Sequence, residues 1–455
     1  MNTEKKSLGQ IDLLNGPIMK SLILFAIPIF ISMLFQQLYN AADTAIVGNI
    51  LGEKSLAAIG SVSAVFDLII HLATGLTGGF GIVISRAYGS KDEDRLKKTV
   101  AGSLKIGVLT VLILTTVSLI GLPGLLRLIN TPEEIYPQAL SYIRIVASFL
   151  IVTFAYNLFS AMLRSIGNSV MPLVFLIISS VLNVILDYIF IAHLNAGVQG
   201  AASATVIAQA FSALLCAFYL IKKVRILIPS KKHFQTEAPL IKELAAQGFA
   251  MVLLTSLVSI SSVILQSGIN GLGTLTIAAH VSARKLFSMS ALCFVSMPSS
   301  VSVFISQNRG ADNGKRILEA MKKSYIFYAL AAVFMTAFLW LLAPTLVRLI
   351  SGSTEPLIIE NGSRYLYVLG PFLFILGVIN TTRSSLQGIG YKLIPVVSSI
   401  IELIGKVIFV TLFIPRFGYD AVIWCEPIIW VFMAIQLTIA WNTNDYIKGV
   451  KAGGS

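Results

Sequence analysis

The chain has 455 residues, of which 56% are hydrophobic and only 12% are charged, whereas soluble domains carry about 25% charged residues. This composition excludes a soluble globular protein and indicates an integral membrane protein. The formal net charge is +13, but the basic residues gather between apolar runs, as they do in cytoplasmic loops, so the surplus does not indicate a nucleic-acid partner.

The apolar runs predict an all-α membrane protein with twelve transmembrane helices. Each run is long enough to cross about 30 Å of hydrocarbon as a helix of about 20 residues. The runs of the first half lie near residues 17–41, 55–84, 100–122, 138–161, 170–192 and 199–221, and those of the second half near 244–268, 275–305, 323–347, 364–386, 393–414 and 419–441. The first run is too long for the core of a signal peptide and lacks its cleavage site, so we expect it to be the first membrane span.

Lysine and arginine separate the connections into two alternating sets. Basic clusters occupy residues 86–98, 222–232 and 309–323, whereas the other connections are poor in cations and carry acids such as Glu133 and Glu355. Cytoplasmic loops hold the excess of Lys and Arg. The sequence therefore predicts a multi-pass protein of the inner or plasma membrane with both termini in the cytoplasm.

The two halves of the chain repeat each other. NILGEKSLAAIGSVSAVF, from Asn49, aligns without gaps with NGLGTLTIAAHVSARKLF, from Asn270, and LRSIGNSVMP further on aligns with LQGIGYKLIP. Matches that recur in order at nearly constant spacing indicate an internal duplication. We expect an N-lobe (1–225) and a C-lobe (226–455), two pseudo-symmetric six-helix bundles in parallel orientation around a central cavity, an arrangement that permits alternating access.

Polar residues interrupt the first apolar run. A charged side chain at the bilayer centre costs about 2.5–3.5 kcal/mol on insertion scales, so Asp43 needs a partner or a function. Gln36, Asn40 and Asp43 share one helical face, which is not expected to face lipid. Pro28, upstream in the same run, removes a backbone hydrogen bond and is expected to bend the helix.

A second acid lies in the fifth apolar run. Asn183 and Asp187 are four residues apart and share a face, and Thr205 in the sixth run can add a hydroxyl. If these groups converge with Asp43, they form a pocket of oxygen atoms that can hold a proton or Na⁺, because apolar surroundings and a neighbouring carboxylate both disfavour two bare negative charges. The alternative for each acid taken alone is a helix-end residue that reaches water.

Other polar residues within apolar runs form a second group of candidates. Asp67 and His71 are i, i+4 neighbours, as are Glu402 and Lys406, and we expect each pair to neutralise itself rather than to act in transport. The remaining candidates are His280, Arg284 and Glu426, which would line a cavity of the second half.

The sequence carries no pattern of an enzyme. Zinc-protease, nucleophile-elbow and Walker motifs are absent, so neither catalysis nor ATP-driven pumping has support, and no cofactor is expected. The glycine run GLTGGFG, residues 75–81, lacks the Lys-Ser/Thr of a phosphate loop and is interpreted as a helix-packing surface. Cys216, Cys293 and Cys425 have no metal-site spacing and are interpreted as small apolar residues, so the only metal considered is Na⁺ at the acidic pocket.

The duplicated six-helix pattern and the opening QQLYNAADTAIVGNILGEKSLAAIG resemble the multidrug and toxic compound extrusion (MATE) transporters over essentially the whole chain. The set Asp43, Asn183, Asp187 and Thr205, with Pro28, is similar to the DinF-like branch. The resemblance implies that these four residues bind the coupling cation in the N-lobe, and that the cavity is lined by Gln36, Tyr39, Asn40 and Asn157.

The resemblance further implies an antiporter that exports bulky cationic or amphipathic compounds in exchange for H⁺ or Na⁺. Its partners would be small-molecule substrates and the lipid bilayer, and it would act as a monomer. Other branches of the family carry an acid in the seventh helix, but residues 244–268 contain none, and neither does the tenth helix. We therefore expect the first half to carry the coupling.

Two alternatives remain from the sequence. A lipid-linked oligosaccharide flippase of the same superfamily would also be polytopic, but it usually has more spans and a cationic cavity, whereas this chain has unpaired acids. A passive channel or a membrane-embedded enzyme needs a through-pore or a reactive group of residues, and the sequence shows neither. No motif identifies the physiological substrate, because polyspecific pockets tolerate many shapes.

Overall fold

The computed structural model describes residues 9–453. Within this range the regular secondary structure is helical, and the one strand-like pairing is an isolated bridge between Gln10 and Asn168. The contacts divide the chain into two compact units. The first unit comprises residues 9–12 and Ile27–Val252, and the second comprises Leu13–Ala26 and residues 253–453. The lobe boundary that we place at residue 225 stays a prediction.

Two long helices belong to both units. Helix α1 (Ile18–Leu51) passes from the second unit to the first between Ala26 and Ile27, just before Pro28, and α8 (Ala238–Asn270) passes back between Val252 and Leu253. The remaining helices of the first unit are α2 (Glu53–Gly89), α3 (Glu93–Leu128), α4 (Tyr136–Ser148), α5 (Leu150–Ser165), α6 (Val170–Tyr188), the π-helix η1 (Ile189–His193) and α7 (Gly197–Lys223), followed by the short 3₁₀ helices η2 (Arg225–Leu227) and η3 (Lys231–Phe234).

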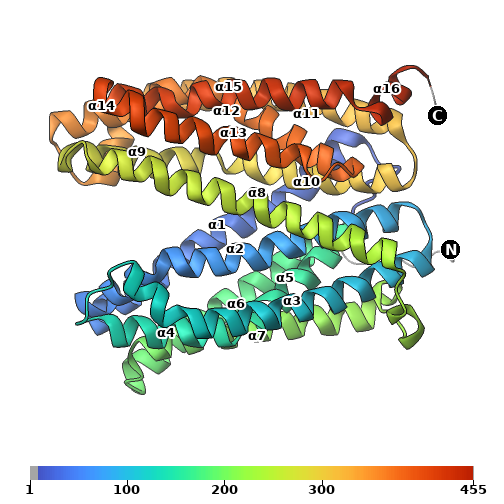
Figure 1. Cartoon of the computed structure of the whole chain (residues 1–455), viewed down its shortest axis with the longest axis horizontal. Helices are drawn as coiled ribbons and strands as arrows, with labels where there is room; N and C mark the ends of the chain where they lie inside the picture. The colour runs from blue at the N-terminus through green and yellow to red at the C-terminus, as the bar shows by residue number, and fades with distance from the viewer. Residues whose placement is uncertain (1–8, 454–455) are drawn as a thin grey trace. The chain divides into compact units, whose positions relative to one another are not determined.

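The second unit has a similar order of helices, except that α9 and α10 stand in place of the single helix α2 and α12 stands in place of α4 and α5. Its elements are α9 (Thr274–Ser290), α10 (Leu292–Gly310), α11 (Gly314–Ser351), α12 (Pro356–Ile389), α13 (Ile394–Ile408), the π-helix η4 (Phe409–Phe413), α14 (Ile414–Phe417), α15 (Tyr419–Thr443) and α16 (Asp445–Lys451). In the first unit α5 packs against α2 and α7, and in the second unit α12 packs against α9, α10, α11 and α15 (Figure 1).

The predicted number of membrane spans is confirmed. Over residues 9–453, eleven helices are long and apolar enough to cross a membrane, or twelve when α4 and α5, which meet at an angle of 47°, form one bent span. Each of the twelve predicted runs overlaps one of these spans. The helices extend beyond the apolar runs because polar residues stabilise their ends, as where the Asp92 carboxylate accepts a hydrogen bond of 3.0 Å from the backbone N–H of Arg95.

The backbone also repeats between the units. A glycine with positive φ stands at the start of both α7 and α15: Gly197, with φ +57°, is the first residue of α7, and Gly418, with φ +56°, directly precedes α15, a conformation that glycine adopts without a steric penalty. The helices that come before them in the chain, α6 and α13, each continue into a π-helix of five residues, η1 and η4 respectively. These shared irregularities match α6, η1 and α7 of the first unit with α13, η4 and α15 of the second.

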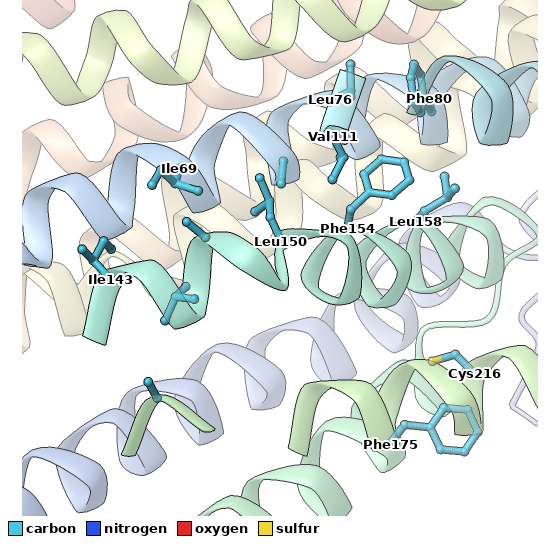
Figure 2. Packing of buried hydrophobic residues seen from close by; sticks show 14 of the residues in the cluster. Ile69, Leu76, Phe80, Val111, Ile143, Leu150, Phe154, Leu158, Phe175 and Cys216 are labelled. Carbon is cyan, nitrogen blue, oxygen red and sulfur yellow. The ribbon is translucent and has the colours of Figure 1, made fainter. Parts of the chain in front are cut away.

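The first unit is held together by interlocking apolar side chains. Phe154 on α5 lies fully buried near Leu76 and Phe80 of α2 and Val111 of α3 (Figure 2). Such packing favours helix association in a membrane, where lipid tails are as apolar as leucine and shape complementarity replaces the hydrophobic driving force.

The glycine run of α2 is a packing surface, as predicted. A Cβ atom on Gly79 would lie 2.6 Å from the Cα of Gly248 on α8, closer than such atoms approach in proteins. The two glycines therefore let the backbones of α2 and α8 meet directly, which larger residues would prevent.

Candidate functional site

The structure brings the two acids of the first unit together. Asp43 on α1 and Asp187 at the end of α6 are close enough for their carboxyl groups to interact directly. Asp187 is fully buried. The phenol of Tyr142, on α4, lies within electrostatic range of both acids. Two helices that are far apart in sequence thus bring a half-buried acid and a fully buried acid together.

This acid pair lacks hydrogen-bond donors. Both carboxyl oxygens of Asp187 and Oδ1 of Asp43 are buried without a donor group of the described chain in reach. Two carboxylates have no hydrogen to share, so they can be joined only when one of them is protonated or when a cation binds between them. The pair therefore requires a positive charge from outside the chain.

Asn183 extends the same unsatisfied cluster. It lies one turn before Asp187 on α6 and is 3% exposed, and neither its Oδ1 nor its Nδ2 has a hydrogen-bond partner within residues 9–453. Leaving a buried polar group unsatisfied costs about 1–3 kcal/mol. Amide and carboxylate oxygens are the ligands that hard cations prefer. The donor set therefore fits a small monovalent cation.

A cavity of about 110 Å³ lies beside this cluster. It is lined by side chains of α1, α2, α5, α6 and α7, among them Gln36, Tyr39, Asn157, Asn183 and Thr205. These five are candidates from the sequence, and the structure places all of them on one cavity. Asn157 donates to the carbonyl of Thr153 at 2.8 Å, and Thr205 donates to that of Ala201 at 3.1 Å.

Several lining residues were not predicted. Thr153 donates a hydrogen bond of 2.5 Å to Gln209 across α5 and α7, and both residues face the cavity together with Tyr156. Polar residues in apolar runs are the signal that could have identified Gln209. Tyr142 could have been found only from its match with Tyr365 in the second repeat, because its spacing from the other polar residues does not indicate a site.

Two further candidates on α1, Asn40 and Pro28, do not line this cavity. Asn40 is exposed and does not line this cavity, although it shares the helical face of Asp43. Helix α1 runs through Pro28 as one continuous helix, and the hydroxyl of Ser32 donates to the carbonyl of Pro28 at 2.8 Å. Proline leaves a carbonyl one turn earlier without its usual donor, so this position is a weak point of the backbone ladder.

The two i, i+4 pairs behave differently. Glu402 and Lys406 form the predicted ion pair, with Oε1 and Nζ 2.9 Å apart. The expectation was wrong for Asp67 and His71: both are exposed, and in the described chain they form no ion pair with each other. Helical spacing brings such residues within reach of each other, but their side-chain rotamers decide whether they meet.

The remaining candidates belong to the second unit. Arg284 and Glu426 form an ion pair of 2.5 Å, and the Nδ1 of His280 lies 3.4 Å from the hydroxyl of Tyr419. Together with Glu402 and Lys406 they make a separate charged cluster in the second unit. No group of three or more His, Cys, Asp or Glu side chains that could hold a metal ion occurs in the described part of the chain.

Comparison with known families identifies the chain. The MatE family model matches residues 28–189 and again residues 249–412, so one model covers both repeats. The chain therefore belongs to the MatE family. The predicted membership in the MATE transporters is confirmed, and the protein is a multi-pass membrane transporter that needs no cofactor, not an enzyme.

Known relatives and solved structures match most of the length of this MATE protein. It is 27% identical to the probable multidrug resistance protein YpnP of Bacillus subtilis, over 81% of this chain and 82% of that protein, and 24% identical to the multidrug export protein MepA of Staphylococcus aureus, over 90% of each. The fold matches a MATE structure in the bent conformation with a TM-score of 0.89 at 24% identity, covering 99% of this chain and 100% of that one. An outward-facing multidrug resistance MATE transporter matches with a TM-score of 0.87 at 26% identity, covering 95% and 96%.

Proposed function

We propose that this MATE protein is a secondary active antiporter that exports bulky cationic or amphipathic organic compounds in exchange for H⁺ or Na⁺ by alternating access. It would act as a monomer in the inner or plasma membrane with both termini in the cytoplasm, as the basic loops predict. The observation that carries the proposal is the pair of Asp43 and Asp187, in which Oδ1 of Asp43 and both oxygens of Asp187 are buried without a donor from the described chain.

The acid pair supplies a physical basis for coupling. Two adjacent carboxylates repel each other when both are charged, and one bound cation removes that repulsion. Asp43 lies on α1 and Asp187 on α6, so the charge state of the pair changes the force between these two helices. A ligand shifts a conformational equilibrium only through a difference in its affinity for the two states. Loading the pair provides such a difference, and the weak point at Pro28 lets α1 respond.

The substrate class is inferred from the cavity lining and from the relatives. YpnP and MepA are named for multidrug resistance and multidrug export. The cavity is lined by aromatic, amide and hydroxyl side chains, and no Lys or Arg is among its lining residues. Aromatic faces and amide oxygens suit organic cations. A cavity without cations would not hold a pyrophosphate, so nothing in it favours the flippase alternative.

The size of the cavity limits what it holds in this conformation. Drug-sized ligands occupy about 300–1,000 Å³, whereas this cavity measures about 110 Å³. The first unit must therefore open before it admits a bulky compound, and as described it has room for an ion and water. Competition between the ion and the substrate then arises because loading the acid pair and opening the cavity favour different conformers.

The proposal is tested with purified protein in liposomes. Efflux of a dye cation is followed first under a pH gradient and then under a Na⁺ gradient. We expect Asp43→Asn and Asp187→Asn each to abolish the gradient-driven component, whereas Glu134→Gln, which removes an exposed loop acid paired with Lys54, leaves it unchanged. Gradient-driven efflux that persists in both acid variants would refute the coupling role. The gradient that drives the wild type identifies the ion.

A further inference from the structure

The second unit holds a buried charged cluster that the proposed coupling mechanism does not use. Lys406 on α13 is 1% exposed, which is unusual for an ammonium group, and its neighbours Glu402 and Glu426 are 7% and 4% exposed. Buried charges are retained only when they are paired and hydrogen-bonded. The arrangement around Lys406 therefore shows what satisfies it.

Oxygen atoms from three helices surround the ammonium group. The Nζ of Lys406 donates hydrogen bonds to Oε1 of Glu402 at 2.9 Å and to Oγ of Ser261, on α8, at 3.3 Å. Oε1 of Glu426, on α15, lies 3.6 Å away as an ion-pair partner. An ammonium group has three hydrogens, and the three oxygens match that number. Two carboxylates and a hydroxyl are also a suitable ligand set for a small monovalent cation.

A second layer of groups fixes these oxygens. The hydroxyl of Ser261 lies 2.8 Å from the carbonyl oxygen of Val258 and 3.2 Å from Oε1 of Glu402, so these two acceptors share its single hydrogen. Oε2 of Glu426 accepts from Arg284, on α9, at 2.5 Å and from the hydroxyl of Tyr365, on α12, at 3.3 Å. Arg383, also on α12, interacts electrostatically with Glu402 and donates hydrogen bonds of 3.0 and 2.8 Å to the hydroxyl of Ser398. The ligand oxygens are thus oriented by groups other than Lys406.

The internal duplication relates this cluster to the first unit. The alignment of LRSIGNSVMP with LQGIGYKLIP places Lys406 at the position of Asn183 and Tyr365 at the position of Tyr142. Superposing the left-handed glycines at the start of α7 and α15 places Glu426 at the position of Thr205. Lys406, Tyr365 and Glu426 of the second cluster therefore occupy positions equivalent to Asn183, Tyr142 and Thr205 of the first unit.

The two clusters differ in where the positive charge that balances their acids comes from. In the first unit the side-chain oxygens of Asp43, Asn183 and Asp187 lack donors within the described chain. In the second unit the ammonium group of Lys406 stands at the position of Asn183 and fills the centre of its cluster. The cluster of the first unit needs a cation from outside the chain, whereas the cluster of the second unit has the ammonium group of Lys406.

We propose that Glu402, Ser261 and Glu426 form a second cation-binding site, in the second unit, and that the ammonium group of Lys406 occupies it as a tethered ligand. The site is specific for a primary ammonium ion or for a monovalent cation of similar size. Because the cation is covalently attached, this site does not exchange ions, and it ties α8, α13 and α15 together. The geometry around Nζ carries the proposal independently of whether the first unit couples transport to an ion.

The first test empties the site and refills it. Lys406→Ala removes the three side-chain carbons beyond Cβ together with the nitrogen, which correspond to n-propylammonium. We expect the variant to unfold at a lower temperature than the wild type, and n-propylammonium chloride to restore at least half of that loss. The wild type should not respond, and neither 1-propanol, of the same size but neutral, nor choline chloride, whose cation is too large for the site, should stabilise the variant. Equal effects of n-propylammonium and 1-propanol, or no effect of either on the folded variant, would overturn the proposal.

A second variant keeps the test decisive if Lys406→Ala does not fold. Lys406→Asn introduces the residue of the equivalent position, and it is made in an Asp43→Asn background so that the first unit does not respond to ions. We expect Na⁺ to raise the unfolding temperature of the double variant more than choline does, and to have no such effect on Asp43→Asn alone. An identical response of the two chains would contradict a cation site at this position. Both readouts are unfolding temperatures, so failure of the transport proposal would not mimic either result.

Discussion

The two units accommodate their buried acids in different ways. In the first unit α1 and α6 bring two acids together, and no cation of the described chain contacts their unsatisfied oxygens. In the second unit α13 and α15 hold two acids as well, but Lys406 and Arg284 pair with them. The duplicated framework thus holds one cluster whose acids have no cationic partner in the described chain and one whose acids are paired with Lys406 and Arg284. We infer that the first unit senses the ion while the second remains constant.

The largest effect on transport is expected when a lysine like Lys406 is introduced into the first unit. Asn183→Lys places a lysine at the position in the first unit that is equivalent to Lys406. We expect a folded protein whose ion-driven dye efflux in liposomes falls at least tenfold, because the lysine neutralises Asp187 permanently. Gln199→Lys adds the same charge at an exposed position at the start of α7 and serves as the control. Full activity of Asn183→Lys would show that the acid pair does not need to change its charge.

Removing the cation from the second unit should cost stability. Lys406→Met keeps the length and apolar stem of the side chain but leaves Glu402 without its closest partner. Removing one partner of a buried ion pair costs about 3–5 kcal/mol in free energy of unfolding. We expect Glu402→Gln in the same chain to recover part of that loss in chemical unfolding experiments. If Lys406→Met is as stable as the wild type, the cluster does not hold the helices together.

The helix contact in the first unit predicts an intermediate effect. Gly79→Ala places a methyl group 2.6 Å from the Cα of Gly248, and overpacking of this kind costs about 1–3 kcal/mol. Gly60→Ala on the same helix α2 meets no atom within 4 Å and is the matched control. Thermal unfolding should separate the two variants, and equal unfolding temperatures would show that α2 and α8 do not need their close approach.

The smallest effect is expected for an exposed ion pair of the second unit. Arg364 and Asp420 lie 2.6 Å apart, but their side chains are 49% and 58% exposed. Exposed pairs contribute about 0–1 kcal/mol, so Asp420→Asn should change the free energy of unfolding by less than Lys406→Met does. A larger loss for Asp420→Asn would mean that burial is not what makes the Lys406 cluster important.

The sequence predicted the features that depend on composition and periodicity. The twelve spans follow from apolar length, and Gln36, Tyr39, Asn157, Asn183 and Thr205 stand out because they are polar within apolar runs. The bend at Phe149 was missed because the run over residues 138–161 continues through it without a break in hydropathy.

Contacts between helices that are distant in the sequence could not be predicted from composition or periodicity. Arg284 and Glu426 are 142 positions apart, and no spacing rule joins them. The equivalence of Lys406 with Asn183 was present in the repeat, but the alignment offset changes along the chain, and the left-handed glycines Gly197 and Gly418 were needed to match α7 with α15. The failure of Asp67 and His71 to pair shows that helical spacing alone does not establish an interaction.

The most direct measurement of the central claim is ion release from purified protein when a dye cation binds, followed at the same time with a pH indicator and a Na⁺-selective electrode. We predict that the wild type releases one of the two ions and that the double variant Asp43→Asn, Asp187→Asn releases neither while still binding the dye. Release from the double variant equal to that of the wild type would contradict an ion site at the acid pair of the first unit.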